Sequence, residues 1–458
     1  MSVSEKTQTA VQSPLSAAEL PDIAVLLMLG TAESPGLPPA RRFAVVRDGL
    51  EIGRRPSDEA EGQGAALAIV DALVSSRHAR ISRRPAGEFV IEDLGSKNGT
   101  FVDNTRVEDQ ARLRNGSLLF FGNHIAVFRM VSALELDAIK AELVAPLGPV
   151  ATCSPALALA CDRLRRLAGA DGEILLLGET GVGKEVYARA VHQLSQRRGR
   201  FMAINCGAIP RDLVESELFG YRQGAHSTAH QAKAGLIEEA EGGTLFLDEI
   251  GEMTQEAQIK LLRFLQDREL TPLGSTRPRK IDVRIIAATN RTGSTGKTPG
   301  GLRDDIIGRL GAAPLYLPPL RSRIEDLGAL AAHFLRTSAT RAFEQPAFRA
   351  LALHEWPLNI RELEKIVGTA AVLTGGTRPI SLRDLPEPIA RAATAAAPPP
   401  RRAAGSSPTP EQLEDLLRRY HGNVADVSRE LGKHRAAVWR WMKKWGIAVE
   451  KYRKPEET

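Results

Sequence analysis

The chain has 458 residues and a net charge of +6; 43% of its residues are hydrophobic, 25% are charged, and its three cysteines are Cys153, Cys161 and Cys206. At about 150 residues per domain this length suggests roughly three domains, and the composition excludes a fibrous or globally disordered chain. The cysteines lack CxxC spacing, which argues against a disulfide framework or a zinc site, and the apolar run at 23–29 is too short to cross a bilayer, so we expect a cytoplasmic protein without membrane contact.

Residues 22–131 contain short β-rich runs, among them IAVLLML, RFAVV, EFVIEDL and HIAVFRMV, separated by Gly, Asn, Asp and Pro. This pattern predicts an all-β sandwich. Three motifs, EIGRR, VSSRHARI and LGSKNGTFVD, fall in order at its loops. Together they resemble the forkhead-associated (FHA) domain, whereas an isolated GR or NG dipeptide would indicate only a tight turn.

The FHA resemblance implies a phosphothreonine site, and hence a phosphothreonine-containing protein as partner. Such a site needs a fixed cation and short hydrogen-bond donors. The residues that the resemblance assigns to the ligand are Arg54, Ser75, Ser76, Lys97 and Asn98. Arg54 and Ser75 would bind the phosphate, with Ser76 and Lys97 as supplementary donors, and Asn98 would bind the ligand backbone. We expect His78 to support a loop rather than touch the ligand.

Residues 151–390 contain apolar strands, EILLLG, GTLFLDEI and DVRIIAATN, separated by helical patterns such as QEAQIKLLRFLQD. This alternation indicates a parallel α/β sheet. After EILLL, GETGVGKE matches GxxxxGK and precedes the helical EVYARAVHQL, which is the context of an ATP-binding P-loop. Its glycines let backbone N–H groups turn toward phosphate, and its lysine neutralises the phosphate charge. The loop residues are Gly178, Glu179, Thr180, Gly181, Val182, Gly183, Lys184 and Glu185, the last in place of the usual Mg²⁺-binding hydroxyl.

Charged and polar residues follow the later strands. GTLFLDEI ends in Asp248 and Glu249, which suit a Mg²⁺-holding carboxylate and a base that orients the attacking water, although an acidic pair alone is also typical of a solvated strand end. DVRIIAATN places Asn290 where its side chain could sense the γ-phosphate. Arg303 and Arg309 in LRDDIIGRL could stabilise transition-state charge in a neighbouring subunit; the alternative for either arginine is a surface ion pair.

The motifs FMAINCGAIP, ESELFG, GGTLFLDEIGEM, KLLRFLQD, VRIIAATNR, LPPLR and WPLNIRELE run in order through residues 154–390. They resemble the AAA+ bacterial enhancer-binding proteins that activate sigma-54 RNA polymerase. The resemblance implies a Mg²⁺-dependent ATPase with a helical lid, which remodels the sigma-54 holoenzyme from enhancer DNA. It implies that Asn205 restrains the catalytic glutamate and that Arg361 is a second nucleotide sensor. Because Arg303 and Arg309 would act in trans, it also implies a homo-oligomer, from a dimer to a hexameric ring.

The loop after ELFG departs from the family pattern. Aligned from ELFG, it occupies the place of the GAFTGA loop, whose tip contacts sigma-54, and its residues are Gly224, Ala225, His226, Ser227, Thr228 and Ala229. His226 replaces an aromatic residue and Thr228 a glycine, so apolar contact and backbone freedom are reduced. Two interpretations stay open: a tuned or pH-sensitive tip that engages sigma-54, or a sigma-54-independent ATP-binding DNA regulator or repressor. A second departure is Leu358 in place of glycine, near Arg361.

Residues 391–410 are rich in Ala, Pro and Ser and predict a linker. Residues 411–458 hold two helical patterns, VADVSREL and HRAAVWRWMKKW, and 432–449 contain five Lys or Arg and no acid. They resemble the Fis-type helix-turn-helix domain. The candidates for DNA contact are His434, Arg435, Arg440, Lys443 and Lys444, the two lysines for phosphates. An AAA+ remodeller of replication or repair proteins would explain the ATPase but not this terminal domain.

Overall fold

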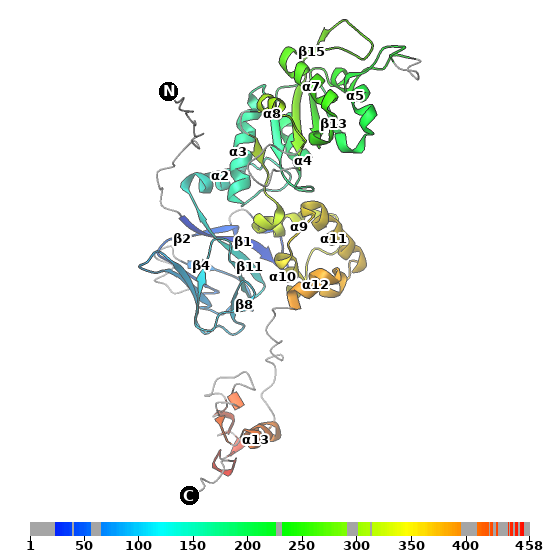
Figure 1. The fold of residues 1–458 in the computed structure, drawn as a ribbon. Helices are drawn as coiled ribbons and strands as arrows, with labels where there is room; N and C mark the ends of the chain where they lie inside the picture. Colours follow the sequence, from blue (N-terminus) through cyan, green and yellow to red (C-terminus); the bar gives the residue numbers. More distant parts are fainter. Residues whose placement is uncertain are drawn as a thin grey trace, which may run out of the picture. The chain divides into compact units, whose positions relative to one another are not determined.

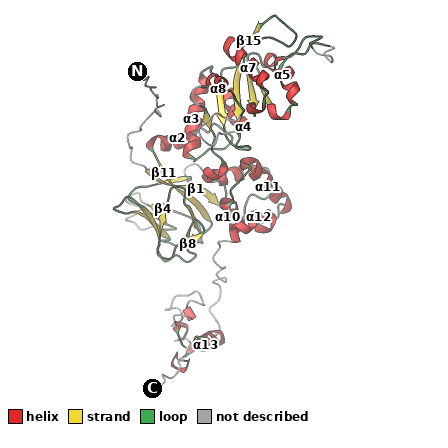
Figure 2. Ribbon diagram, in the orientation of Figure 1, coloured by secondary structure: helices red, strands yellow, loops and turns green. Residues whose placement is uncertain are grey.

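The computed structural model describes most of the chain, and its helices and strands are drawn in Figures 1 and 2. The described residues are 23–38, 41–55, 66–225, 231–290, 301–311, 314–394, 410–420, 422–424, 427–428, 438, 440–442, 445–447 and 449–452. The chain divides into two compact units, Met1–Ala396 and Ala397–Thr458. Every helix in the described ranges is too short or too polar to cross a lipid bilayer.

The first unit begins with a β sandwich, as the strand pattern predicted. One sheet has the order β2-β1-β11-β10-β7-β8 and the other β4-β3-β5-β6-β9. The first sheet consists of β1 (Ile23–Thr31), β2 (Phe43–Val46), β7 (Thr100–Val102), β8 (Thr105–Arg106), β10 (Leu118–Phe121) and β11 (His124–Val131). The second consists of β3 (Gly49–Gly53), β4 (Ala66–Ala68), β5 (Ala79–Arg83), β6 (Phe89–Asp93) and β9 (Gln110–Leu113).

The second part of this unit is a five-stranded parallel sheet of order β13-β14-β17-β12-β18, which confirms the α/β prediction. Its strands are β12 (Ile174–Leu177), β13 (Phe201–Asn205), β14 (Thr244–Asp248), β17 (Arg284–Thr289) and β18 (Leu315–Tyr316). Around it lie α3 (Pro155–Gly169), α4 (Lys184–Leu194), η2 (Cys206–Ala208), α5 (Arg211–Phe219), α6 (Leu236–Glu239), η3 (Ile250–Glu252), α7 (Gln255–Asp267), α8 (Asp304–Leu310) and the strand pair β15 (Glu269–Leu270) and β16 (Arg279–Lys280). In a parallel sheet the carboxyl ends of the strands meet at one edge, where ligands usually bind.

Residues 320–394 form a helical lid. It consists of η4 (Leu320–Ser322), η5 (Ile324–Asp326), α9 (Leu327–Leu335), α10 (Gln345–Leu353), α11 (Asn359–Leu373), η6 (Leu382–Asp384) and α12 (Glu387–Thr394). Helix α12 extends four residues into the segment predicted as a linker, because the sequence RAAT there is rich in alanine, the best helix former. Trp356 is fully buried in the lid, where its indole N–H donates to the Leu351 carbonyl at 3.1 Å.

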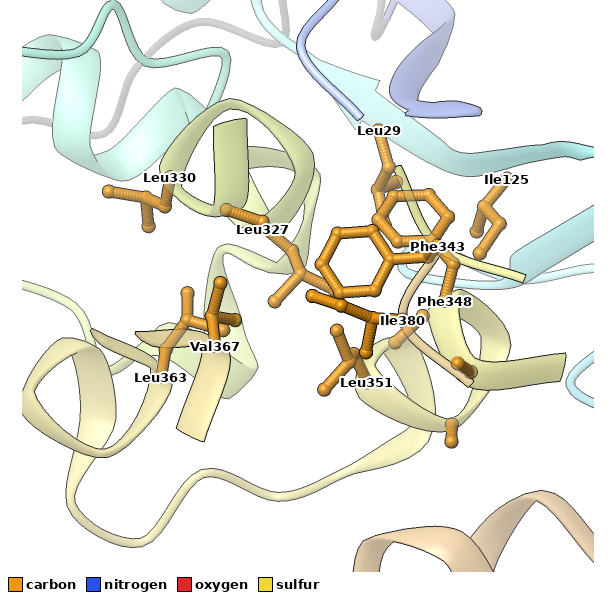
Figure 3. Packing of buried hydrophobic residues seen from close by; sticks show 14 of the residues in the cluster. Leu29, Ile125, Leu327, Leu330, Phe343, Phe348, Leu351, Leu363, Val367 and Ile380 are labelled. Atoms are coloured by element: carbon orange, nitrogen blue, oxygen red, sulfur yellow. The ribbon is translucent and has the colours of Figure 1, made fainter. Parts of the chain in front are cut away.

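The sandwich and the lid share one hydrophobic core (Figure 3). In this view Leu29 of β1 and Ile125 of β11 lie beside Phe343 and Phe348 of the lid. The backbones also approach closely: a Cβ on Gly328 of α9 would lie 2.0 Å from the Leu29 carbonyl oxygen, so no larger residue fits there. This contact explains why β1 is buried along nearly its whole length, since one face packs inside the sandwich and the other against the lid and α2 (Ala133–Val144).

The second unit contains α13 (Pro410–Arg419), the short η7 (Val449–Tyr452) and further helical turns among its described residues. Its core consists of Leu413, Leu417, Val424, Val427, Val438 and Met442. Trp441 and Trp445 stack with ring centres 6.5 Å apart. Of the residues proposed to contact DNA, Arg440 lies exposed on a helical turn, while His434, Arg435, Lys443 and Lys444 lie outside the described residues.

Candidate functional site

The P-loop follows β12 and ends at the first residue of α4, Lys184. The lysine side chain is 7% exposed, and its Nζ donates to the carbonyls of Gly178 and Glu179 at 3.0 and 3.1 Å. Burial lowers the pKa of Lys184, while the nearby carboxylates of Asp248 and Glu249 raise it. The structure thus places one buried cation between the loop and the acidic pair that ends β14.

Neighbouring strand ends complete this cluster. The Gly178 N–H donates to the Thr289 carbonyl at 3.3 Å, which ties the P-loop to the end of β17. The Asn290 amide donates to the Thr180 hydroxyl at 3.3 Å. The predicted sensor Asn290 therefore lies directly beside the P-loop.

Asn205 ends β13 opposite Asp248 of β14. Its side-chain oxygen accepts a hydrogen bond from the Gly207 N–H at 2.9 Å. A Cβ on Gly207 would lie 2.5 Å from a Glu249 carboxylate oxygen and 3.3 Å from the same Asn205 oxygen. Both side chains thus converge on Gly207, which brings Asn205 close to Glu249 as expected, although no hydrogen bond joins the two in the described structure.

The acidic pair has a strained backbone. Glu249 has a φ of 53°, in the left-handed region, and its N–H donates to the Asp248 carboxylate at 3.0 Å. A non-glycine residue in this region is held there by its surroundings and occurs most often at functional sites. The unusual conformation at Glu249 therefore marks the end of β14 as a candidate functional position.

The lid contacts the P-loop through the N-terminus of α11. Asn359, fully buried and with a φ of 57°, donates from its side chain to the Thr180 carbonyl at 3.0 Å and the Glu179 carboxylate at 3.2 Å. Glu179 also pairs with Arg321 at the start of the lid, and this guanidinium lowers its pKa. These contacts fix the lid against the nucleotide loop.

Leu358 does not disturb this contact. Its φ is −104°, a value that any residue adopts, so the glycine of the family pattern is not required by the backbone. A Cβ on Gly181 would lie 2.3 Å from the carbonyl oxygen of Leu358 and 3.2 Å from the Cβ of Arg361. The predicted second sensor Arg361 therefore lies against the P-loop, and its charge lowers the pKa of Lys184.

Three of the predicted residues are not brought into this cluster. The Glu185 side chain is 49% exposed and pairs with Arg189 on the surface of α4. Arg303, at the start of α8, pairs with Asp305 at 2.7 Å, and Arg309 donates to the Leu265 carbonyl at 3.3 Å. Neither arginine has a hydrogen bond to the P-loop in the described structure, so neither completes the site of its own chain.

The loop that departs from the GAFTGA pattern is described only at its start. Gly224 has a φ of 83°, and the Ala225 N–H donates to the Arg222 carbonyl at 3.1 Å, as in a tight turn. The remaining predicted residues, His226, Ser227, Thr228 and Ala229, lie outside the described residues.

The residues expected to bind phosphothreonine are joined by hydrogen bonds across three loops of the sandwich. The Arg54 N–H donates to the Ser75 carbonyl at 3.0 Å, and its Nε donates to the Val74 carbonyl at 2.8 Å. The Lys97 N–H donates to the Ser75 hydroxyl oxygen at 3.0 Å, which leaves the hydroxyl hydrogen able to donate to an anion. The backbones of Arg54 and Lys97 are thus both tied to Ser75, whose hydroxyl lies between the two loops.

Asn98 and Ser76 extend this surface. The Asn98 amide donates to the Leu73 carbonyl at 2.7 Å, and the Arg55 N–H donates to the Ser76 carbonyl at 3.0 Å. Asn98 and Ser76 are both exposed. All five predicted ligand-binding residues thus lie on the connected loops that follow β3, β4 and β6.

Buried groups hold these loops in place. His78, fully buried, accepts the Ser75 N–H at its Nδ1 at 3.0 Å, and its Nε2 lies 3.4 Å from the Gly99 carbonyl, so the neutral ring with a proton on Nε2 joins the two loops. Burial lowers the pKa of His78. Asp93 accepts from the backbone N–H groups of Ser96 and Thr100. The supporting role predicted for His78 matches this geometry.

Sequence reasoning missed the residues that join the parts. Arg321 and Asn359 lie within LPPLR and WPLNIRELE, motifs that gave no role for them. The contact between sandwich and lid was also missed, although the run IAVLLML is apolar without alternation, which is the pattern of a strand covered on both faces.

Comparisons with known proteins identify the domains that carry these candidate sites. The family model of the Sigma-54 interaction domain matches residues 150–316, that of the AAA+ ATPase lid domain matches 321–401, and that of the FHA domain matches 50–122. Regulatory protein AtoC of Escherichia coli (strain K12) is 38% identical over 315 residues, which are 66% of this chain and 68% of AtoC. Transcriptional regulatory protein XylR of Pseudomonas putida is 45% identical over 239 residues, 51% of this chain and 42% of XylR.

Among solved structures, NtrX from Brucella abortus in complex with ATP matches with a TM-score of 0.47 and 30% identity, over 65% of this chain and 69% of that chain. The chain spans about half the length of several of the relatives it matches. The ordered motifs, the family models and the match to AtoC together show that this chain belongs to the sigma-54-dependent transcriptional regulators, with an FHA domain preceding its sigma-54 interaction domain.

Proposed function

We propose that this chain is an FHA-regulated, ATP-hydrolysing activator that remodels sigma-54 RNA polymerase from enhancer DNA sites. The observation that carries the proposal is the convergence of Lys184, Asn290 and the pair Asp248 and Glu249 at the carboxyl edge of one parallel sheet. This arrangement supports phosphate binding next to a carboxylate pair, which is what ATP hydrolysis requires.

The residues around Lys184 fit ATP with Mg²⁺. Gly181 and Gly183 have φ values of 80° and 98°, so the loop adopts the conformation that lets N–H groups surround phosphate. Asp248 is the carboxylate that would hold Mg²⁺, because Mg²⁺ usually takes one or two carboxylates plus substrate phosphates. When bound, the ion would neutralise charge on the phosphate oxygens.

Glu249 would orient the attacking water and accept its proton, while Asn290 would contact the γ-phosphate. Asn205, which converges with Glu249 on Gly207, would restrain that carboxylate until the nucleotide changes the loop. Asn359 and Arg321 would report the nucleotide to the lid, because both contact the P-loop through Glu179. In this scheme Glu185 pairs with Arg189 and takes no part in holding the metal.

Hydrolysis would need a second subunit. Arg303 and Arg309 lie on α8 and bond to groups of their own surface rather than to the P-loop. We infer that they act on a neighbouring chain, as cations that stabilise transition-state charge. The active form would be a homo-oligomer, from a dimer to a hexameric ring, that holds DNA through residues 411–458.

The preformed FHA loops support recognition of a phosphothreonine-containing protein that controls the ATPase. Arg54, Lys97 and Ser75 lie on loops joined by hydrogen bonds and would offer charge and a short donor, which is the chemistry that phosphate recognition uses. Because the same sandwich packs on the lid, ligand binding would act on the part of the ATPase that contacts the P-loop.

A second candidate is a regulator that binds ATP and DNA without engaging sigma-54. The observation that favours it is the sequence GAHSTA, in which His226 and Thr228 replace an aromatic residue and a glycine of the sigma-contacting loop. The two candidates share the ATP site, the FHA site and the DNA-binding residues, and they differ only in what this loop touches.

The experiment measures ATP turnover and sigma-54 binding of the full chain, because removing the sandwich would expose the core it shares with the lid. Glu249→Gln should lower turnover by about 10²–10⁴-fold, the usual contribution of a general base. The wild-type chain, trapped with ADP and a metal fluoride, should bind sigma-54, and His226→Ala should lose this binding.

The two readouts separate the candidates. Turnover without any sigma-54 binding by the wild-type chain would favour the sigma-54-independent regulator. Turnover that survives in Glu249→Gln would remove Glu249 from the role of base.

A further inference from the structure

A hollow of about 210 Å³ opens beside the phosphothreonine loops. Most of its lining is apolar and includes Phe101, Phe120, Phe121 and Leu73, a leucine that is 43% exposed. Gln345, the first residue of α10, also lines it. The hollow is therefore bounded by both the FHA sandwich and the ATPase lid.

The hollow is continuous with the ligand-binding surface. Asn98 lines it and also belongs to the predicted phosphothreonine site, where its amide donates to the Leu73 carbonyl at 2.7 Å. An extended peptide advances about 3.3 Å per residue, so a peptide whose backbone contacts Asn98 places a neighbouring side chain over the hollow. An apolar side chain matches the aromatic lining.

The position of Gln345 is fixed by Arg349 on the same helix. Arg349 is 8% exposed, donates to the Asn104 side chain at 2.6 Å, and has its guanidinium carbon 4.6 and 4.4 Å from the ring centres of Phe101 and Phe120. Residues four apart share a helix face, so the contact that docks Arg349 on these rings also holds Gln345 at the hollow. Phe101 and Phe120 thus line the hollow and also contact the lid helix α10 through Arg349.

We propose that a phosphothreonine peptide is read by both domains: the FHA loops bind the phosphate, and an apolar side chain next to the phosphothreonine enters the hollow that Gln345 of the ATPase lid completes. The proposal rests on the phosphothreonine-binding function proposed above. The bound peptide then contacts the lid directly, and the lid contacts the P-loop through Asn359. In this proposal the lid joins ligand recognition to the ATP site through its contacts with the sandwich and the P-loop.

The test uses the full chain and a library of phosphothreonine peptides randomised at each position flanking the phosphothreonine. The wild-type chain should select apolar side chains at one position. Gln345→Lys should shift the selection at that position toward acidic side chains, and Gln345→Glu toward basic ones, by about fivefold each, as expected for an added ion pair worth about 1 kcal/mol. Gln193→Lys, at an exposed glutamine of α4, should leave the selection unchanged.

Opposite shifts in peptide selection by the two Gln345 variants cannot result from a general loss of folding. Thermal unfolding of each variant provides a second check that the chain is folded. If neither Gln345 variant changes the selection while Arg54→Ala abolishes peptide binding, the proposed FHA function stands. The proposal that Gln345 of the lid reads the peptide is then wrong. If the wild-type chain binds no phosphothreonine peptide, the proposed FHA function fails, and this inference fails with it.

Discussion

The proposed phosphothreonine site and the proposed ATP site are held together in different ways. Ser75, Lys97 and His78 are joined by hydrogen bonds inside one domain. The P-loop instead depends on the lid, through Asn359 and Arg321. The phosphate-binding loops of the first site lie within the sandwich, and in our proposal the lid completes only the neighbouring hollow. The second site combines a sheet, a lid and, in our proposal, arginines from a neighbour. Substitutions should therefore act locally in the first site and over a distance in the second.

The lid is the part that the two sites share. Helix α10 packs on the sandwich through Arg349, and α11 packs on the P-loop through Asn359. Buried ion pairs add to this contact, since Arg42 pairs with Asp326 and Arg129 with Glu325. Burial raises the pKa of Glu325, and the Arg129 charge opposes that rise.

The largest expected effect tests whether the ATP site needs a neighbour. Arg309→Ala should lower ATP turnover by about 10³-fold or more, as for other arginines that act in trans, without weakening ATP binding. Arg166→Ala, at an exposed arginine of α3, is the matched control. Mixing Arg309→Ala with Glu249→Gln should restore part of the turnover, because mixed interfaces bring an intact arginine to an intact glutamate. Mixtures as inactive as the separate variants would contradict action in trans.

The next effect tests whether sandwich and lid fold together. Arg42 and Asp326 are each 3% exposed, and removing one partner of a buried pair costs about 3–5 kcal/mol. Arg42→Ala should lower the free energy of unfolding by that amount in a denaturant titration of the full chain. Arg391→Ala breaks a pair whose side chains are 75% and 72% exposed, so it should cost about 1 kcal/mol or less. Equal effects of the two substitutions would show that the sandwich is only loosely attached.

Contiguous motifs made the location of both candidate sites predictable, because the P-loop, the acidic pair and the FHA loops each need their residues at short spacing. The lid contacts were not predictable in this way. Arg321, Asn359 and Arg349 come from separate segments, and only the folded lid brings them to Glu179, Thr180 and the sandwich.

For Glu185 the sequence predicted a contact that the structure does not show. Its position in the P-loop motif suggested a role at the nucleotide, but the first turn of α4 carries it to the surface, where Arg189 four residues later pairs with it. A motif fixes the backbone position of a residue, whereas the neighbouring helix face decides where its side chain goes.

A smaller effect is expected at the phosphate-binding loops of the sandwich. Arg54→Ala should weaken binding of a phosphothreonine peptide by about tenfold to a hundredfold, since hydrogen bonds to charged groups contribute about 1.5–3 kcal/mol. Arg47→Ala, at an exposed arginine of the same sandwich, serves as control in a fluorescence anisotropy titration. ATP turnover without peptide should be the same in both variants. A fall in basal ATP turnover with Arg54→Ala would show that this residue also affects the ATP site, and would contradict the expectation that its effect is local.

The smallest effect concerns the histidine that joins the FHA loops. Because burial lowers the pKa of His78 below its ordinary value of 6.5, the unfolded chain takes up a proton before the folded chain does as the pH falls. The stabilisation of the folded chain by neutral His78 is therefore fully present above pH 6.5. It declines as the pH drops from 6.5 toward the lowered pKa of His78 in the folded chain. Burial also lowers the pKa of the partly buried His124, which acts in the same direction, so the pH dependence of the wild-type chain alone is not specific for His78. His78→Asn keeps an acceptor for the Ser75 N–H but cannot titrate, and the difference in unfolding free energy between pH 7.5 and 5.5 should be smaller in this variant. Equal differences in both chains would mean that His78 is protonated at no cost to the loops, and that the phosphothreonine site is less rigid than its hydrogen bonds indicate.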